Sequence, residues 1–247
     1  MKIIINSKYR YLFGFIESIP KRFGIGGETL HQGRNQIKAF VVQDTEIVVK
    51  HYKHPNFVQK IAYRWIRPSK AKRAYLYALR LAEMNIDTPE AVACVEKCRW
   101  GGLWDSWFIS TRCGDESLFP VLVETPDYNR TIAKSFAHFL VGLHAKGFLH
   151  GDLNLANILY RKEKDGYHFT VIDINRSKFM DAPSQSECLH NLMRVTHRVD
   201  LLRDIITSYA QERGWDAEEC CCKVESLLHE FERRRARKYK WKKLFNK

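Results

Sequence analysis

The segment from His150 to Asp173 constrains the fold of this chain more than any other. It begins His-Gly-Asp-Leu-Asn-Leu-Ala-Asn-Ile-Leu at His150, and a later Val-Ile-Asp ends at Asp173. Short apolar runs that predict strands flank two carboxylic acids, Asp152 and Asp173, and one amide, Asn157. We therefore expect a fold in which a polar loop follows a helix end and a second acid leaves a nearby strand.

These residue types suit phosphoryl transfer. In that reaction the protein orients the attacking hydroxyl and holds Mg²⁺ against the phosphates, with little covalent chemistry of its own. Asp152 and Asn157, five residues apart in one loop, can divide those tasks. Asp173, at a strand end, can reach the same metal from the other side. The alternative is a chance polar loop in an unrelated α+β fold.

The remaining sequence predicts strands first and helices second. Apolar spacing predicts a helix over 69–84, and another from Ile132 to Leu143 with Gly147 as its C-cap. From Glu187 onward, two or three more helices reach the end of the chain. Strand-forming runs lie mostly before them, at 29–32, 36–42, 46–52, 91–98 and 104–111. At 247 residues, this order describes a two-lobed α+β protein.

The chemical segment resembles the catalytic segment of the protein kinase-like superfamily. That pattern is His-Arg/Gly-Asp-Leu, with Asn five residues after the Asp and a metal-binding Asp after a later strand. The resemblance implies ATP and Mg²⁺ as cofactors, Asp152 as the catalytic residue, and Asn157 and Asp173 as metal ligands. The match is residue by residue at His150, Asp152, Leu153, Asn157 and Asp173.

The same resemblance implies a small antiparallel-sheet N-lobe and a mostly helical C-lobe. We place the N-lobe, with its nucleotide-binding sheet and helix, at 1–113. The C-lobe, with the catalytic loop, occupies 114–232, and a basic aromatic tail occupies 233–247.

Two upstream stretches look like the superfamily's nucleotide-binding residues. Ile47-Val48-Val49-Lys50 resembles the strand whose lysine pairs with the α- and β-phosphates. Gly33, Arg34 and Asn35 lie between two predicted strands, where the superfamily has its phosphate loop. The glycine-rich stretch at 24–27 is the other candidate, and we interpret it as a flexible approach to the strand.

One feature departs from the superfamily pattern. A Glu from the helix after the lysine strand normally pairs with that lysine, and alignment would place it near Leu76, where no acid occurs. Glu83 could serve after a register shift, Glu28 or Glu90 could substitute, or Lys50 could be unpaired. This departure keeps a catalytically weak pseudokinase in view.

A protein substrate is disfavoured by two differences from protein kinases. Asn154 stands where those enzymes carry a Lys two residues after the catalytic Asp, and Asp173-Ile174-Asn175 replaces Asp-Phe-Gly. No Ala-Pro-Glu follows to anchor a long activation segment. A smaller or non-peptide acceptor is therefore indicated.

The wider pattern resembles the bacterial lipopolysaccharide core kinases, which phosphorylate a heptose or Kdo sugar of the lipid A core. The resemblance runs from about Thr29 into the last helices. It implies a lipid-linked sugar acceptor and peripheral association with the cytoplasmic face of the bacterial inner membrane. The stretches that carry it begin at Gly33, Ser69, Asn85, His150 and Asp173.

The net charge of +13 is concentrated at the end of the chain. Residues 233–247 contain nine Lys or Arg and no acid, and removing these nine from 41 leaves 32 basic against 28 acidic residues. Tyr239 and Trp241 lie among them. A basic segment with aromatic insertions suits an anionic membrane surface, where each Lys or Arg adds about 1 kcal/mol. A solvated helix end is the alternative, and nucleic acid is the less favoured partner.

Several features predict a cytoplasmic protein. No apolar run approaches the ~20 residues that span a bilayer, and the apolar stretch in the first six residues is too short for a signal peptide. The seven cysteines form no regular framework, and an odd number cannot pair fully within one chain.

Three other functions remain open at this point. The first is a small-molecule kinase of the aminoglycoside or choline type, or an atypical protein kinase, since both carry His-Gly-Asp-Leu. The second is a pseudokinase that binds a membrane or a partner without turnover. The third is an RNA-binding protein that acts through the tail.

Overall fold

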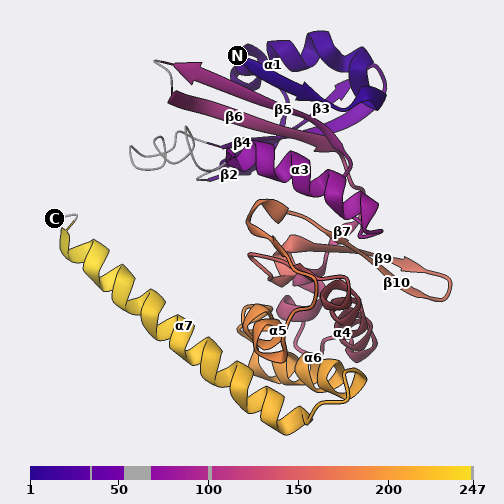
Figure 1. Cartoon of the computed structure of the whole chain (residues 1–247), viewed down its shortest axis with the longest axis vertical. Coiled ribbons are helices and arrows are strands. Elements are labelled where there is room, and N and C mark those ends of the chain that lie inside the picture. Colours follow the sequence, from indigo (N-terminus) through magenta and orange to yellow (C-terminus); the bar gives the residue numbers. More distant parts are fainter. Residues whose placement is uncertain (34, 53–67, 100–101, 246–247) are drawn as a thin grey trace. The chain divides into compact units, whose positions relative to one another are not determined.

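The structure is a computed structural model that describes residues 1–33, 35–52, 68–99 and 102–245 (Figure 1). It divides into two compact units. The first comprises Met1–Gly114 together with Val171–Arg176, and the second comprises Asp115–Thr170 together with Ser177–Lys247.

The first unit is built on a six-stranded antiparallel sheet. Its strands lie in the order β1-β5-β6-β4-β3-β2. All of the strands expected in this part of the chain are present, and β1 is added at the sheet edge beside β5. Their bounds are β1 Lys2–Ile5, β2 Glu28–Gln32, β3 Asn35–Val42, β4 Thr45–Tyr52, β5 Ala91–Arg99 and β6 Gly102–Thr111.

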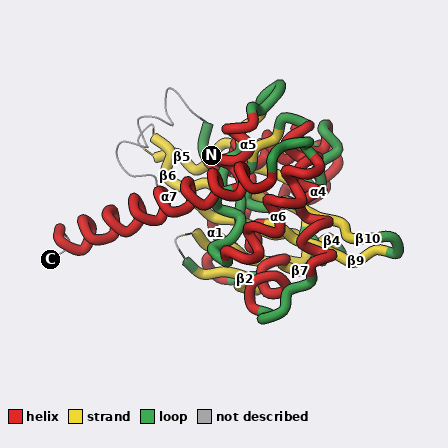
Figure 2. The backbone as a smooth tube through the Cα atoms, turned by 90° about the horizontal axis from the view of Figure 1, so that it is seen from below, coloured by secondary structure: helices red, strands yellow, loops and turns green. Residues whose placement is uncertain are grey.

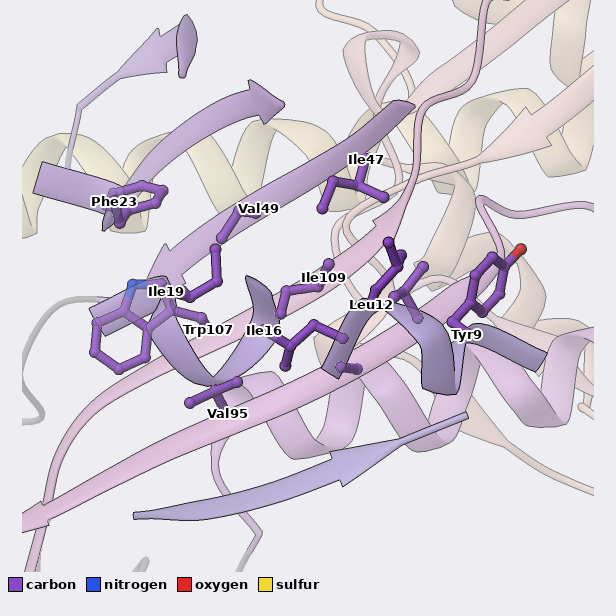
Figure 3. Packing of buried hydrophobic residues seen from close by; sticks show 12 residues of the cluster. Tyr9, Leu12, Ile16, Ile19, Phe23, Ile47, Val49, Val95, Trp107 and Ile109 are labelled. Atoms are coloured by element: carbon purple, nitrogen blue, oxygen red, sulfur yellow. The ribbon is translucent and has the colours of Figure 1, made fainter. Parts of the chain in front are cut away.

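One face of this sheet is covered by the N-terminal segment, which comprises a 3-10 helix at Ser7–Leu12 and helix α1 at Phe13–Ile25. Its apolar side chains pack on alternate residues of the central strands, such as Val49 and Ile109, which are fully buried (Figure 3). Because side chains alternate across a sheet, the intervening residues, Lys50 among them, face the other side.

Helix α1 corrects the expectation for the glycine-rich stretch at 24–27. Gly24 lies in the last turn of α1, and Gly26 is its C-cap. Gly27 follows with a φ of +85°, and a Cβ there would lie 2.5 Å from the Phe40 ring. The stretch therefore ends a packed helix and turns the chain into β2, so it is not a flexible approach.

Helix α3, at Lys70–Glu83, lies on the opposite side of the sheet from α1 (Figure 1). Ser69 caps its N-terminus by accepting a hydrogen bond from the Lys72 amide. Ala71, Tyr75 and Ala78 are buried on one face of the helix, Leu79 is half-buried and Ala82 is exposed. The predicted helix is confirmed.

Strands β3 and β4 form a hairpin. Val42 pairs with Thr45, which leaves a two-residue turn of Gln43 and Asp44 with φ values of +47° and +58°. Two consecutive positive φ values define the turn type that matches the right-handed twist of a hairpin. This turn fixes the register that places Ile37 opposite Lys50.

The second unit is mostly helical, with two small sheets. One sheet has the order β10-β9-β7 and the other pairs β11 with β8. The predicted helix around 132–143 is α4. The two or three helices predicted from Glu187 onward are three, α5, α6 and α7, and α5 contains Glu187. The bounds are β7 Glu116–Ser117, α4 Arg130–Ala145, β8 Phe148–Leu149, β9 Ile158–Glu163, β10 Gly166–Val171, β11 Lys178–Phe179, α5 Gln185–Leu192, α6 Val199–Glu212 and α7 Ala217–Phe245.

Gly147 shows why α4 ends where it does. It follows the C-cap Lys146 with a φ of +74°, as expected of a C-cap glycine. A Cβ at this position would lie 1.8 Å from the carbonyl oxygen of Met180. The Met180 amide donates to the Gly147 carbonyl at 2.8 Å. This close approach holds β11 against β8, immediately before the catalytic segment.

Helix α7 packs against α6 and α5 along its first half and extends beyond them along its second half (Figures 1 and 2). Cys220 and Cys221 are buried in the packed half, and Cys222 is exposed. From Arg233 to Trp241 every residue is exposed.

Candidate active site

The catalytic loop of the second unit follows β8 and is held by its own amide side chains. The Asp152 carbonyl oxygen accepts hydrogen bonds from Nδ2 of Asn154 and Nδ2 of Asn157, each at 2.9 Å. Asn154 also accepts from the Ala156 amide at 3.0 Å and caps a short 3-10 turn at Leu155–Asn157. The loop backbone is therefore held at the Asp152 carbonyl.

His150 is a buried residue that contacts the backbone of the catalytic loop. It is only 1% exposed, and its Nδ1 accepts a hydrogen bond from the Asp152 amide at 3.1 Å. Its carbonyl oxygen accepts from Nδ2 of Asn191, in α5, at 2.7 Å. The first residue of the motif is therefore a buried structural group that orients the backbone of Asp152.

A buried network extends this support into the helical core. Nε2 of His144, in α4, contacts Oδ1 of Asn191 at 3.1 Å, and its Nδ1 contacts the Tyr209 hydroxyl, in α6, at 2.8 Å. Burial lowers the pKa of His144 to about 4, so the ring is neutral at physiological pH. A neutral ring can donate through one nitrogen and accept through the other, as these two contacts require.

The Asp152 side chain is paired with an arginine. Nη2 of Arg194 lies 2.6 Å from Oδ1 of Asp152. The guanidinium also lies over the ring of Phe231, in α7, at 4.8 Å. Arg194 follows α5 and had not been recognised from the sequence, where nothing distinguishes it from other basic residues.

In the first unit, Lys50 and Asp173 are brought together. Nζ of Lys50, on β4, lies 2.7 Å from Oδ1 of Asp173, and its side chain is only 13% exposed. Asp173 follows β10 with a φ of +57°, a region that non-glycine residues occupy mainly in turns and at functional sites. Nδ2 of Asn175 donates to the same carboxylate.

Tyr52 completes this group of residues. Its ring lies under the Lys50 ammonium at 5.5 Å. Burial, and then the charge of Asp173, raise the pKa of Tyr52 well above its usual value, while a hydrogen bond with Asn175 acts in the other direction. Tyr52 therefore stays a neutral phenol, and its ring packs against the Lys50 ammonium.

The structure answers the question of the missing helix acid. Lys50 is paired with Asp173, so the expectation that it could be unpaired is wrong. Glu28 pairs with Arg112 at 3.1 Å and Glu90 is engaged elsewhere, by Lys8 at 2.7 Å. Neither therefore substitutes for the missing acid.

The alignment that placed an acid near Leu76 is also corrected. Leu76 is 41% exposed, because it lies on the side of α3 that faces away from the sheet. Glu83, at the last position of α3, is exposed too. The buried charged residue of this helix is Arg73, whose charge acts on Tyr52. The buried charge that this helix contributes near Tyr52 is thus a cation and not an acid.

Two residues of the predicted phosphate loop, Gly33 and Asn35, lie where β2 ends and β3 begins. The Gly33 amide donates to the carbonyl oxygen of Asn35 at 3.2 Å, and Asn35 begins β3 opposite Tyr52. A Cβ on Gly33 would lie 2.7 Å from Nε2 of His31. Arg34 lies outside the described residues.

The predicted site residues thus form two groups. Lys50 lies with Asp173 in the first unit, and Asp152 lies with Asn157 in the second. That Asn157 and Asp173 share one metal stays a prediction, because they belong to different units. Sequence analysis missed four supporting residues, namely Tyr52, Asn175, Asn191 and Arg194.

Comparison with known proteins identifies the family. The model of the lipopolysaccharide kinase (Kdo/WaaP) family matches residues 30–217. The chain belongs to this family. The solved structure described as WaaP in complex with acyl carrier protein is similar, with a TM-score of 0.60 at 16% sequence identity over 95% of this chain and 98% of that one. No curated protein sequence matches the chain.

Membership in the lipopolysaccharide kinase (Kdo/WaaP) family makes the chain a phosphotransferase and implies that it uses ATP. The likeness to WaaP confirms the kinase-like α+β fold, with a small antiparallel sheet and a helical region. Among the described residues, no helix is both long enough and apolar enough to cross a membrane.

Proposed function

We propose that this lipopolysaccharide kinase transfers the γ-phosphoryl group of ATP to a hydroxyl of a Kdo or heptose sugar in the lipid-linked inner core. Asp152 orients the acceptor hydroxyl and accepts its proton. The observation that carries this assignment is the catalytic loop itself, in which two amides fix the Asp152 backbone and so set the position of its carboxylate, whose side chain is 22% exposed. A pre-positioned carboxylate is what a general base requires.

Asn157 and Asp173 fit the role of magnesium ligands. Asn157 uses Nδ2 to donate to the Asp152 carbonyl, so its Oδ1 is the atom that remains for a cation. Asp173 contributes a carboxylate. Mg²⁺ is typically bound by one or two such protein oxygens together with water and substrate phosphates. No cluster of three His, Cys, Asp or Glu side chains suited to a metal occurs in the described part of the chain, so the phosphates would complete the site.

The nucleotide is assigned to the β-sheet unit. Lys50 would bind its α- and β-phosphates, and the predicted phosphate-loop residues Gly33, Arg34 and Asn35 would take part in binding the nucleotide. The Lys50–Asp173 pair supports this role, because a nucleotide with Mg²⁺ would give each partner a new counter-charge, the phosphates for Lys50 and the metal for Asp173. The pair would then be the nucleotide-free arrangement of the two residues.

The direct test is ATP consumption by the full-length protein with lipid A that carries Kdo, or Kdo and heptose. Mass analysis should show one added phosphoryl group on a core sugar and should identify that sugar. Transfer to a peptide or to a soluble aminoglycoside, with none to the core sugar, would overturn the proposal. Nucleotide binding without turnover on any of these acceptors would favour the pseudokinase alternative.

The basic aromatic tail is proposed to bind the anionic surface on the cytoplasmic face of the bacterial inner membrane. All of its residues from 233 to 241 are exposed, and Tyr239 and Trp241 are 71% and 67% exposed. Exposed aromatic rings beside several Lys and Arg side chains suit the interface between headgroups and acyl chains.

Deletion of residues 233–247 is expected to weaken binding to anionic vesicles by at least tenfold, since nine cations would be lost at about 1 kcal/mol each at most. Phosphorylation of a detergent-dispersed acceptor should fall by less than twofold. Vesicle co-sedimentation at low and high salt measures the first quantity. Unchanged binding to vesicles that contain anionic lipid would contradict the proposed membrane role of the tail.

A further inference from the structure

The chain segment that follows α5 is attached to the catalytic loop at three points. Asn191 donates to the His150 carbonyl at 2.7 Å, and the Leu155 amide donates to the carbonyl oxygen of Val195 at 3.2 Å. Arg194, between these two contacts, pairs with Asp152 at 2.6 Å. Because one side-chain and one backbone hydrogen bond to the catalytic segment flank it, the position of Arg194 beside Asp152 is set by the fold.

Some hydrogen-bond donors of the Arg194 guanidinium are unused among the described residues. One nitrogen, Nη2, contacts Asp152, and one face of the group lies over the Phe231 ring at 4.8 Å. No other partner of this side chain occurs among the described residues. A guanidinium has five N–H donors in a planar fork, so Nη1 and Nε remain available. The side chain is 33% exposed, so a ligand can reach it from solution.

A partly exposed arginine with a supported plane is suited to an oxyanion. Guanidinium groups bind carboxylate and phosphate through two parallel hydrogen bonds, and stacking on an aromatic ring holds the plane in place. In this structure a carboxylate, that of Asp152, already occupies part of the fork. A carboxylate or phosphate on a bound ligand would compete for the same donors.

We propose that Arg194 binds an oxyanion of the sugar acceptor, a carboxylate or a phosphate, next to the hydroxyl that receives the phosphoryl group. The inference rests on the proposed function, in which Asp152 orients that hydroxyl. On binding, Arg194 exchanges its contact with Asp152 for the acceptor oxyanion, and the released carboxylate turns to the hydroxyl. Arg194 thus makes an anion beside the hydroxyl a condition for efficient transfer.

The acceptor is favoured over the nucleotide as the ligand of Arg194 on geometric grounds. The carboxylate that Arg194 contacts is the one assigned to the acceptor hydroxyl, so substituents of the same sugar lie within its reach. Lys50, assigned to the nucleotide phosphates, and Asp173, assigned to the metal, are already paired with each other at 2.7 Å.

The test uses the full-length protein and Kdo-bearing lipid A in micelles. Arg194→Gln is expected to raise KM for this acceptor by at least tenfold, while kcat and KM for ATP change by less than about twofold. Arg194→Lys should recover part of the loss, because it keeps the charge but not the fork. The difference in acceptor KM between wild type and Arg194→Gln should disappear for one of two modified acceptors. These are an acceptor whose Kdo carboxyl groups are methyl esters and an acceptor whose lipid phosphates are removed. The modification that removes the difference identifies the oxyanion.

Arg130→Gln is the matched control. Arg130 also pairs with an acid, Asp204 at 3.0 Å, and also lies near an aromatic ring, that of Tyr128 at 5.9 Å, in the same unit. It should leave both KM values unchanged. Thermal unfolding of all variants verifies that they are folded.

Three results would overturn the role of Arg194. The first is a fall in kcat of Arg194→Gln with an unchanged acceptor KM, and the second is a rise confined to its KM for ATP. The third is a difference in acceptor KM from the wild type that neither esterification nor phosphate removal reduces. If the wild type transferred no phosphate to any acceptor, the proposed function would fail separately. Equilibrium binding of labelled Kdo-bearing lipid A to wild type and Arg194→Gln would then still test the role of Arg194. Weaker binding by Arg194→Gln would support it, and equal affinity would overturn it.

Discussion

Asp152→Ala is expected to lower kcat for phosphoryl transfer by about 10³-fold, within the range that loss of a general base produces. Nucleotide affinity should change by less than about threefold, because the Asp152 carboxylate is assigned to the acceptor hydroxyl and not to the nucleotide or its metal. The fold should tolerate the change, since the amides of Asn154 and Asn157 bind the Asp152 carbonyl and not its carboxylate. Single-turnover transfer and equilibrium nucleotide binding measure the two quantities.

The control for this variant is Asp204→Asn. Asp204 accepts from the Tyr128 hydroxyl at 2.6 Å and pairs with Arg130 at 3.0 Å, so it is a second acid–arginine pair in the same unit. Its replacement should leave kcat within about twofold of the wild type. Normal turnover by Asp152→Ala would show that the carboxylate has no role in transfer.

Asp173→Ala is expected to weaken nucleotide binding in the presence of Mg²⁺ by at least tenfold and to abolish turnover. Without Mg²⁺ the affinity should change little or rise slightly. The reason is that the variant loses a metal ligand but also frees Lys50, which is paired with Asp173 at 2.7 Å, for the phosphates. Nucleotide titrations with Mg²⁺ and with a chelator separate the two effects.

The variant also removes the counter-charge of a lysine that is only 13% exposed. A buried cation without its partner is costly, so some loss of thermal stability is expected. Asp173→Asn, which keeps the shape and the contact with Asn175, provides the comparison at nearly constant packing. Equal loss of affinity with and without Mg²⁺ would argue that Asp173 acts on Lys50 and not on a metal.

Local sequence signals predicted the elements whose causes are themselves local. The Gln43–Asp44 turn lies between two β-rich runs, and Gly147 ends α4 with the positive φ that favours glycine. The contacts of Asn154 and Asn157 with the Asp152 carbonyl are local too, although the sequence analysis assigned neither residue that role. In each case the partners are close in the chain.

Other features depend on packing between distant segments and were missed. Helix α1 contains Pro20 and has no side-chain cap at its start, so the usual signals of a helix are weak there. Its apolar side chains form a helix because the sheet gives them a surface to cover. The pairing of Lys50 with Asp173 likewise requires β4 and the chain after β10 to meet, which no local pattern reveals.

Arg194 illustrates the same limit within the candidate site. The sequence around it offers no motif, and its role depends on the placement of α5 against the catalytic loop. For the missing helix acid, the sequence showed part of the answer and the fold supplied the rest. Its absence was evident from the sequence, but the face on which Leu76 lies, and the partner that Lys50 takes instead, followed from the fold.

The exposed half of α7 has a consequence for helix–coil equilibrium. Its packed half, up to Glu232, supplies a preformed helical end, so the costly nucleation step is already met and the rest need only propagate. Propagation is opposed by repulsion between like charges four residues apart, such as Arg233 with Arg237 and Arg234 with Lys238. Anionic headgroups would cancel that repulsion. The helix would therefore grow toward its C-terminal end on contact with such a surface, and fray from that end in its absence.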